Sequence, residues 1–438
     1  MTAAPARPRT AVVLAAGSSQ RMCAVTGGGS KLLAQIGGMS LIERSVRGVA
    51  REVDRVVVLV GHDPDRVAGR AARAAPGRVQ IVRATGWERG NGATLAAAPP
   101  ALRDEPLLLL VAGDHLFADG TLSALVDAGG PAALVDPKPG RDVLEEATRV
   151  VVAGGRAVRF GKEGPSCCTD CGAFVVPPAI FACQRQAAAA GDMTLAGAVS
   201  RLAALTPLVA VPVGPSDWWQ DVDTPADLHR ARERVRRSLG RLSDGPVARL
   251  VNRPLSTRLS MLLAPLRLPP DLVSVAVCGL GLLAGAVLAT GQPVVGAALA
   301  QATSVLDGVD GELARLQARV TPRGAMLDGV LDRCADTAIA AGLGRWALAR
   351  GRDPASTLVL AVAASAASLL SMATKDRAAA LGLPRDRERA LSFLLGGRDG
   401  RLLLVAVFAL LRRPAAGLLA ITLTAGIASA LRVRLASR

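Results

Sequence analysis

The hydrophobic positions of this chain follow two patterns, and the change between them falls between residues 240 and 270. Before it, short apolar runs alternate with polar, Gly-rich stretches and with segments of helical periodicity. The apolar runs predict buried strands at 12–16, 56–60, 107–112 and 208–213. The segments between them predict helices, for example at 41–51 and 122–128. Alternating strands and helices are typical of a parallel or mixed sheet covered by helices on both faces, so residues 1–230 are predicted to form an α/β domain.

After residue 270 the apolar stretches are long enough to cross a bilayer, which takes about 20 residues per helix. The segment 272–306 has no charged residue and is broken only at 291–293, which leaves room for two spans. The segments 325–349 and 354–374 predict one span each, and 402–431 predicts two spans around Arg412 and Arg413. Residues 269–438 are therefore predicted to form an all-α domain of six transmembrane helices.

Basic residues lie mainly on one side of these predicted spans. That side carries Arg315, Arg319, Arg323, Lys375, Arg377, Arg385, Arg387, Arg389, Arg398 and Arg401. The opposite side carries Arg345, Arg350, Arg352, Arg412 and Arg413. Cytoplasmic loops are enriched in Lys and Arg, so the first side is predicted to be cytoplasmic. With six spans, we then expect a multi-pass protein of the cell membrane whose α/β domain and two termini are cytoplasmic.

The two parts are joined by residues 231–268, which are rich in arginine and partly amphipathic. This pattern predicts a connecting helix followed by a helix that lies on the membrane surface, among lipid headgroups. An ordinary solvated linker is the alternative that the pattern leaves open.

The composition points to an anionic partner. The chain has 438 residues, with 52 Lys and Arg against 36 Asp and Glu, and a formal net charge of +16. Aromatic residues make up only 2% of the chain and tyrosine is absent, so stacking on nucleobases is disfavoured and nucleic acid is not the expected partner. Phosphorylated metabolites and lipid headgroups remain as partners.

The first predicted strand leads directly into a loop of small residues. Loop residues without bulky side chains let backbone N–H groups approach phosphates closely, and nearby cations then neutralise a triphosphate. Arg21 and Lys31 follow the loop and are predicted to act in this way as catalytic residues. The predicted nucleotide-binding residues of this region are Ala15, Ala16, Gly17, Ser18, Arg21 and Lys31.

The segment from Leu14 to Met22, followed by Lys31, resembles the signature of the nucleotidyltransferases that act on sugar phosphates and polyol phosphates. Ser19 stands where many members have glycine. The resemblance implies a Rossmann-like α/β sandwich. It also implies attack by a phosphate oxygen of the second substrate on the α-phosphorus of the nucleotide, with loss of pyrophosphate.

Three carboxylates are candidates for a metal site in this domain. Asp114 follows the strand at 107–112, and ligand sites form at the carboxyl ends of strands in open α/β sheets. Asp221 and Asp223 alternate with Val222, so on an extended segment they share a face. Carboxylate oxygens suit Mg²⁺ or Mn²⁺, and the resemblance makes these three residues the ligands of the metal that bridges the α-phosphate.

The resemblance implies further contacts in this domain. Gly90 and Asn91 are expected to contact the nucleotide, and Lys162 and Asp170 the acceptor phosphate. The match is nearest to the inositol-1-phosphate cytidylyltransferase branch, which implies CTP and a polyol phosphate as substrates. The base, CTP or UTP, and the polyol stay open.

Four cysteines offer an alternative interpretation of part of this domain. A tetrahedral zinc site needs four such ligands. Their spacing is irregular, which favours free thiols. The residues are Cys167, Cys168, Cys171 and Cys183.

The predicted membrane domain contains two pairs of aspartates. Asp307 and Asp310 are three residues apart, and Asp328 and Asp332 four apart, so each pair shares one face of a helix. Carboxylates at membrane depth are costly and usually functional. Two divalent ions, Mg²⁺ or Mn²⁺, are the expected means of balancing four facing carboxylates.

The spacing around these aspartates resembles the motif D-x-x-D-G-x-x-A-R-x8-G-x3-D-x3-D of the CDP-alcohol phosphotransferases. The resemblance implies a six-helix membrane fold that forms a homodimer. It assigns Asp307, Asp310 and Asp328 to metal, and Asp332 to metal and to deprotonation of the acceptor hydroxyl. The remaining motif residues are expected to contact the nucleotide: Gly311, Ala314, Arg315 and Gly324.

The fusion resembles bifunctional enzymes that make a CDP-alcohol and then consume it. The implied partners are CTP, a polyol phosphate, the CDP-alcohol intermediate and an acceptor alcohol, and the products are pyrophosphate, CMP and a phosphodiester. The alternative function is a membrane-anchored nucleotidyltransferase that acts on another sugar or polyol phosphate, with a lipid as the acceptor of the second step. An inactive half that serves as an anchor, and a transporter with a regulatory domain, are less well supported. The membrane signature is complete, Asp114 and Arg21 are present in the first domain, and no inverted repeat is seen.

Overall fold

The computed structural model of the chain describes residues 7–140, 143, 147–162, 168–240, 244–382, 391, 393 and 395–436. It divides into two compact units, Met1–Arg234 and Val235–Arg438. Each unit is described by itself below.

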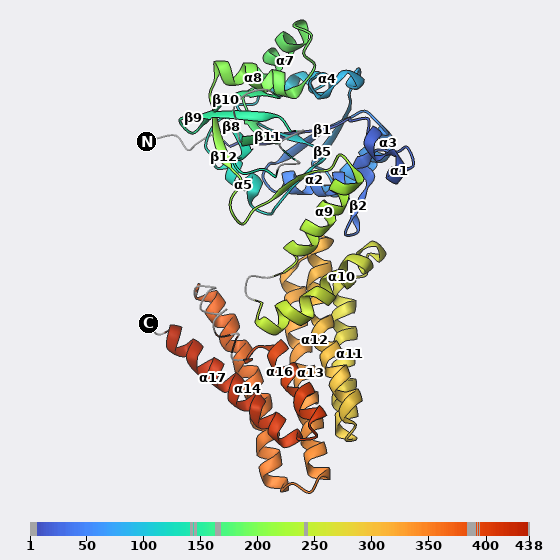
Figure 1. The fold of residues 1–438 in the computed structure, drawn as a ribbon, viewed down its shortest axis with the longest axis vertical. Coiled ribbons are helices and arrows are strands. Elements are labelled where there is room, and N and C mark those ends of the chain that lie inside the picture. Colours follow the sequence, from blue (N-terminus) through green and yellow to red (C-terminus); the bar gives the residue numbers. More distant parts are fainter. Residues whose placement is uncertain are drawn as a thin grey trace. The chain divides into compact units, whose positions relative to one another are not determined.

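The first unit is built on a mixed sheet, which has nine strands among the described residues (Figure 1). The strand order is β5-β4-β1-β6-β11-β8-β12-β10-β9. The neighbours β5, β4, β1 and β6 are parallel, whereas β11 runs antiparallel to β6 and β8. The strands are β1 Thr10–Ala15, β4 Arg55–Val60, β5 Val79–Arg83, β6 Leu108–Ala112, β8 Ala132–Asp136, β9 Arg149–Ala153, β10 Arg156–Gly161, β11 Cys168–Val176 and β12 Leu208–Pro212.

Helices cover both faces of this sheet. Figure 1 shows α4, α7 and α8 on one face and α2, α3 and α5 on the other. The helices of this unit are α1 Cys23–Thr26, α2 Leu41–Ala50, α3 Pro64–Ala74, α4 Asn91–Ala96, α5 Thr121–Val126, α7 Ala179–Ala189 and α8 Leu195–Leu205. The α/β architecture is confirmed, and each strand predicted above is found within one or two residues of its expected limits.

Two short ribbons stand apart from the main sheet. Strand β7 (His115–Phe117) pairs antiparallel with β13 (Trp219–Asp221), and β2 (Gln35–Ile36) pairs with β3 (Met39–Ser40). The first ribbon matters for function, because it joins residues about a hundred positions apart. In its register Asp221 is directly opposite His115.

The second unit is helical. Its long helices are α11 Pro270–Ala289, α12 Pro293–Leu316, α13 Pro322–Ala349, α14 Pro354–Ala380, α16 Arg398–Leu410 and α17 Pro414–Ala436. Each of α11, α12, α13, α14 and α17 begins at a proline, which is compatible with the first helical turn because an N–H is unpaired there anyway. Within the described residues, three helices are both long and apolar enough to cross a membrane: α11, α14 and α17.

The structure therefore supports a helical membrane domain, but three candidate spans do not confirm the six that were predicted. Helix α12 has 24 residues and α13 has 28, but both carry the motif aspartates, and α16 has only 13 residues. Two residues that the sequence analysis assigned to a cytoplasmic loop, Arg398 and Arg401, belong instead to the first turns of α16, where both are buried. Arg385, Arg387 and Arg389 lie outside the described residues.

Glycines bring α11 and α13 into close contact. A Cβ on Gly342 would collide with the carbonyl oxygen of Gly285, and a Cβ on Gly285 would collide with that of Ala338. Helices with small residues at their interface approach backbone to backbone, as is common in membrane bundles. This contact fixes α13, the helix that carries Asp328 and Asp332.

The connecting region contains α9 (Pro225–Ser238) and α10 (Arg253–Leu263), as the arginine-rich pattern predicted. Helix α10 buries Ser256, Thr257 and Ser260, whereas Leu255 and Leu262 are exposed. A helix on the surface of a soluble protein buries its apolar side chains and exposes its polar ones, whereas α10 does the opposite. It fits a helix whose apolar side meets lipid, and that location stays a prediction.

Polar contacts bind α10 to α12. The carboxylate of Glu312, which is 0% exposed, accepts hydrogen bonds from Ser256 Oγ at 2.8 Å and Ser260 Oγ at 2.6 Å. Arg253 Nη1 donates to the same carboxylate at 2.6 Å and also pairs with Asp244. Gly308 leaves room for this guanidinium, because a Cβ there would lie 2.5 Å from Arg253 Nη1 and the arginine would have to shift. A buried carboxylate is stable only with such partners.

Candidate functional sites

In the first unit, the candidate site forms where two neighbouring parallel strands end. Strand β1 pairs with β6 so that Leu14 is opposite Ala112, and the chain then continues into the loop at Gly17 on one strand and into Asp114 on the other. Gly113 is required between them, since a Cβ there would lie 2.8 Å from the carbonyl oxygen of Leu14. The small-residue loop and the first carboxylate therefore meet at the same edge.

The loop has the exposure expected of a phosphate-binding segment. Ala15 and Ala16 are buried at the end of β1, whereas Gly17 and Ser18 are exposed. Ser19 adopts a left-handed conformation with φ of 62°, which glycine adopts most readily. Its Oγ accepts a hydrogen bond from the backbone N–H of Lys31 at 2.8 Å, so the loop fixes the lysine.

Lys31 lies among the predicted metal ligands. Its Nζ is 2.7 Å from Asp114 Oδ2 and also forms an ion pair with Asp223. Arg21 Nη2 is 2.7 Å from the other oxygen of Asp223. The structure thus brings Arg21 and Lys31 together with the predicted carboxylates, although Arg21 and Asp223 are 202 positions apart in the chain.

His115 completes this group. Its Nδ1 is 2.8 Å from Asp114 Oδ1 and 3.7 Å from Asp221 Oδ1, and its ring stacks on Trp219 at 5.7 Å. Asp114, His115 and Asp221 each offer one ligand atom within 4.8 Å of the others. The two carboxylates of this group suit a divalent ion. The sequence analysis did not include His115 among the candidate residues of this site.

The electrostatics of the group follow from burial and close opposite charges. Burial by itself lowers the pKa of Lys31, but Asp114 and Asp223 raise it well above its usual value. Burial by itself also lowers the pKa of His115, but Asp221 and Asp114 raise it to about 9. Burial raises the pKa of Asp114, yet Lys31 and His115 hold it far below its ordinary range. Lys31 and His115 are therefore cations beside an ionised Asp114 at neutral pH.

The predicted acceptor residues have different surroundings. Asp170, on β11, accepts a hydrogen bond from the N–H of Gly172 at 2.7 Å, and burial raises its pKa to about 6. A Cβ on Gly172 would lie 2.8 Å from the ring of His115, so this turn adjoins the carboxylate group. Lys162 makes no hydrogen bond or ion pair with the described residues. Its role as an acceptor contact stays a prediction.

The predicted nucleotide loop at Gly90 and Asn91 is tied to a distant segment. Asn91 Oδ1 accepts a hydrogen bond from the N–H of Leu195 at 2.7 Å. Gly90 has φ of 135°, and a Cβ there would lie 2.6 Å from the carbonyl oxygen of Met193. These contacts account for both residue types structurally, so a nucleotide contact here is not required to explain them.

The cysteines do not form a zinc site within the described residues. Cys171 and Cys183 are buried free thiols, and Cys168 is half-buried. The groups of potential metal ligands found in the part of the chain that the structure describes contain no cysteine. Cys167 lies outside the described residues.

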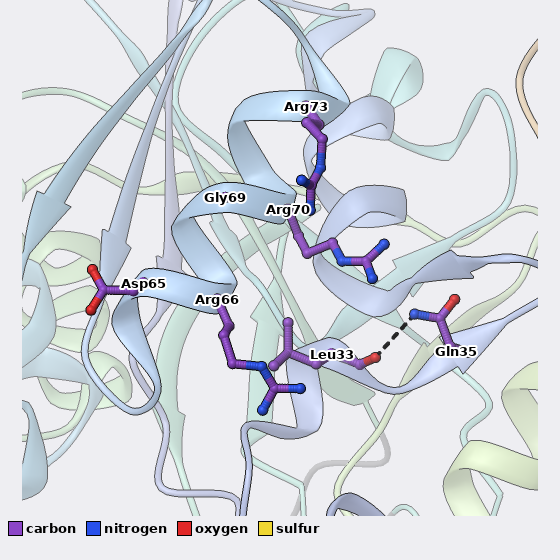
Figure 2. A pocket seen from close by; sticks show the side chains of 7 residues that line it. All are labelled: Leu33, Gln35, Asp65, Arg66, Gly69, Arg70 and Arg73. Atoms are coloured by element: carbon purple, nitrogen blue, oxygen red, sulfur yellow. Dashed lines mark hydrogen bonds between the residues drawn. The ribbon is translucent and has the colours of Figure 1, made fainter.

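A basic hollow of about 550 Å³ lies apart from these residues, between α3 and the segment of Leu33 and Gln35. Figure 2 shows Arg66, Arg70 and Arg73 along this side of α3. Arg66 pairs with Asp63 at 3.1 Å and Arg70 with Glu43 at 3.5 Å, so much of its charge is balanced locally. The hollow shares no residue with the carboxylate group.

In the second unit, three motif aspartates meet between α12 and α13. Asp307, Asp328 and Asp332 each offer a carboxylate oxygen within 4.8 Å of the others. Asp307 belongs to α12 and the other two to α13, so these aspartates lie on helices as expected. Asp310, the fourth predicted carboxylate, is not part of this group. Three carboxylates this close fit one or more divalent ions, because oxygen ligands of like charge need a cation between them.

The other motif residues have contacts of their own. Asp310, 6% exposed, accepts hydrogen bonds from Ser274 Oγ and from the N–H of Gly311. Arg315 Nη2 donates to the carbonyl oxygen of Leu239 at 2.9 Å, so this arginine is engaged with the connecting region. The N–H of Gly324 donates to Thr321 Oγ1 at 3.0 Å, and Thr321 caps the N-terminus of α13 in this way. Ala314 lies on α12, and nucleotide contacts of these residues stay predictions.

Two arginines that the motif does not contain lie at this group, one within it and one beside it. Arg398 Nη1 pairs with Asp307 and lies 2.6 Å from Asp332 Oδ1, while its Nε is 3.2 Å from Asp336 Oδ1. Arg401 Nη2 is 2.7 Å from the second oxygen of Asp336. The sequence pattern predicted both arginines to lie in a loop between two spans. The signal that could have indicated a buried role for them is Asp336, a third aspartate in the apolar segment 325–349.

Comparison with known proteins accounts for both units. Residues 11–143 match the MobA-like NTP transferase domain, and residues 267–428 match the CDP-alcohol phosphatidyltransferase family. A solved inositol-1-phosphate CTP transferase from T. maritima has 22% sequence identity and a TM-score of 0.47, and the match covers 52% of this chain and 96% of that one.

Curated relatives match along nearly the whole length. A bifunctional IPC transferase and DIPP synthase of Rubrobacter xylanophilus is 38% identical over 437 residues, which is 97% of this chain and 96% of that protein. A protein with the same description from Archaeoglobus fulgidus is 29% identical, over 92% of this chain and 78% of its own length. The chain therefore belongs to the family of bifunctional IPC transferases and DIPP synthases, with a nucleotidyltransferase domain and a CDP-alcohol phosphotransferase domain in one polypeptide.

Proposed function

We propose that the first unit transfers a cytidylyl group from CTP to inositol 1-phosphate, and that the second unit transfers the resulting phosphoinositol group to an acceptor alcohol. The observation that carries this proposal is the pair of carboxylate groups, one in each unit. Asp114 lies within the residues matched to the NTP transferase domain, and Asp307, Asp328 and Asp332 lie within those matched to the CDP-alcohol phosphatidyltransferase family. The names of the full-length relatives support inositol phosphate as the polyol phosphate.

In the first step, the side chains mainly position and neutralise. The backbone of Gly17 and Ser18 is exposed for contact with phosphates, and Arg21 and Lys31 supply positive charge beside it. The attacking phosphate oxygen is already anionic, so orientation and charge neutralisation provide most of the rate enhancement. Asp114, Asp221 and Asp223 would hold Mg²⁺ or Mn²⁺, which would neutralise the α-phosphate.

In the second step, the acceptor hydroxyl must lose a proton as it attacks the phosphorus of the CDP-alcohol. Asp332 is proposed to take that proton, and CMP leaves. Asp307, Asp310, Asp328 and Asp332 would hold the divalent ions, which would neutralise the diphosphate. The overall products are pyrophosphate, CMP and a phosphodiester.

The location proposed for the second unit is the membrane. Three apolar helices support a membrane protein, and we propose that α12, α13 and α16 complete six spans, with the first unit and both termini in the cytoplasm. We further propose that two chains pair through this unit. Labelling of single introduced cysteines in intact cells, at Lys138 for the first unit and at Arg352 for the opposite loop, tests the orientation. Labelling of the Lys138 position from outside would contradict it.

The activity is tested on membranes that contain the full chain. CTP, Mg²⁺ and inositol 1-phosphate should give pyrophosphate, followed by CMP in comparable amount. UTP and other sugar or polyol phosphates, each tested in parallel, determine the base and the polyol. Pyrophosphate without CMP for every soluble or lipid acceptor would refute the second step.

A further inference from the structure

We infer that Arg398 is a positioning residue of the phosphotransferase site, an internal cation that neutralises Asp307 and Asp332 until divalent ions bind these carboxylates. The inference rests on the metal-binding role proposed above for these aspartates. It assigns a function to a residue outside the recognised motif.

The geometry places one guanidinium among carboxylates of two helices. Arg398, on α16, uses Nη1 to pair with Asp307 of α12 and with Asp332 of α13, the latter at 2.6 Å. Its Nε is 3.2 Å from Asp336 Oδ1, one helical turn after Asp332. Three helices are thus held together by one side chain at the point where the carboxylates converge.

The charges explain why such a cation is needed. Carboxylate oxygens of Asp307, Asp328 and Asp332 lie within 4.8 Å of one another, and like charges at this distance repel strongly away from water. Among the described residues, no other Lys or Arg forms an ion pair with Asp307 or Asp332. The side chain of Arg398 is only 7% exposed, so its own charge is also stable only while it is paired.

The arginine has unused bonding capacity. Its Nη2 is buried and has no hydrogen-bond partner within the part of the chain that the structure describes. Buried donors are rarely left unpaired. The unpaired Nη2 therefore leaves the Arg398 guanidinium free to exchange one hydrogen-bond partner for another. When ions occupy Asp307 and Asp332, the guanidinium loses those contacts but retains Asp336.

Asp336 is held independently, which makes it a suitable anchor. Arg401 Nη2 contacts its second oxygen at 2.7 Å, and Arg401 Nη1 donates to the carbonyl oxygen of Gly396 at 2.9 Å. Arg401 has no contact with Asp307 or Asp332. The two arginines therefore offer a matched pair, one inside the carboxylate group and one beside it.

Guanidinium and divalent ion compete for the same oxygens, and this competition gives the test. The full chain in detergent is titrated with Mn²⁺ and free Mn²⁺ is measured by electron paramagnetic resonance, while thermal unfolding is recorded without metal. For Arg398→Gln we expect a lower metal-free midpoint, because the carboxylates then repel. We also expect a Kd for Mn²⁺ lower by about tenfold, because a close positive charge is removed.

Arg401→Gln is the control. It removes a buried partner of Asp336 and also lowers the midpoint, but its Kd for Mn²⁺ should stay within about twofold of wild type, since no ligand oxygen loses a contact. If Arg398→Gln does not fold, Arg398→Lys replaces it. A lysine keeps the charge without the planar fork and reaches fewer carboxylates, so a smaller decrease in Kd is expected.

The outcomes separate this inference from the proposed function. Wild type that binds Mn²⁺ and releases CMP, together with an Arg398 variant whose Mn²⁺ affinity is unchanged or weaker, refutes the role of Arg398 alone. Wild type that binds no Mn²⁺ at the second unit refutes the metal site itself, and the inference with it.

Discussion

Both units place a basic side chain inside a group of carboxylates, but they do so with different structural elements. In the first unit Lys31 comes from a short turn and meets Asp114 beyond a strand end. In the second unit Arg398 comes from a helix and meets Asp307 and Asp332 on two other helices. The first arrangement depends on loops supported by a sheet, and the second on rigid helices packed side by side.

The two groups differ more in their elements than in their exposure. The side chains of Asp221 and Asp332 are 39% and 14% exposed, but those of Asp114 and Asp307 are both 26% exposed. The two cations, Lys31 and Arg398, are 8% and 7% exposed, so each is stable only while it is paired. The comparison teaches that the same charge pattern can be built on loops at a sheet edge or on packed helices.

The largest expected effect separates the two chemistries. Asp332→Asn should lower the rate of CMP release by about 10²- to 10⁴-fold, the usual contribution of a general base, and leave pyrophosphate release intact. Both products are measured in one assay with CTP, Mg²⁺ and inositol 1-phosphate. Equal loss of both products would show that the two units do not divide the reaction as proposed.

The converse change addresses the first unit. Lys31→Met should lower pyrophosphate release by about 10²-fold or more, because a buried positive charge is lost beside the developing charge of the phosphates. CMP release from supplied CDP-inositol should be unaffected. Lys138→Met, at an exposed position outside the site, serves as control, and a similar loss there would contradict the specific role of Lys31.

A third prediction concerns the helix contact that supports the second site. Gly342→Ala should destabilise the second unit by about 1–3 kcal/mol, because the added methyl collides with the backbone of Gly285. Gly279→Ala, on α11 where a Cβ meets no atom within 4 Å, should be neutral or stabilising by up to about 1 kcal/mol. Thermal unfolding in detergent measures both, and equal effects would argue against the close contact.

The smallest expected effect concerns the cysteines. Cys168→Ser should change pyrophosphate release by less than about twofold, since replacing a half-buried thiol that forms no metal group alters little. Zinc content measured on the purified chain should be the same in variant and wild type. If both bound zinc and pyrophosphate release decreased in the variant, the result would support the zinc interpretation.

The sequence predicts the elements well where apolar runs are long and uninterrupted, as in β1, β4 and β6. It also predicts the convergence of Asp307, Asp328 and Asp332, because their spacing places them on helix faces. It does not predict Arg398, since basic residues beside a span usually flank it in water and the partners of this one are 62 to 91 positions away in the chain. Long-range pairing of this kind leaves no periodic signal.

The same limit applies to the first unit. The loop before Arg21 and the carboxylate at Asp114 were predictable, because both follow strands of strong apolar pattern. The pairing of His115 with Asp221 depends on a three-residue ribbon that is too short to be detected by alternation. Asn91 was predicted to contact a nucleotide from its motif, yet its side chain is bound to Leu195, a contact that no local pattern indicates.

The meeting of Gly285 and Gly342 has a consequence for how the protein can evolve. Asp332 is ten residues before Gly342, about 15 Å along the same helix. The orientation of Asp332 therefore depends on a helix contact that is remote from the carboxylate group. We therefore expect natural variants to keep small residues at Gly285 and Gly342, because a larger side chain at either position would shift α13 and Asp332 with it.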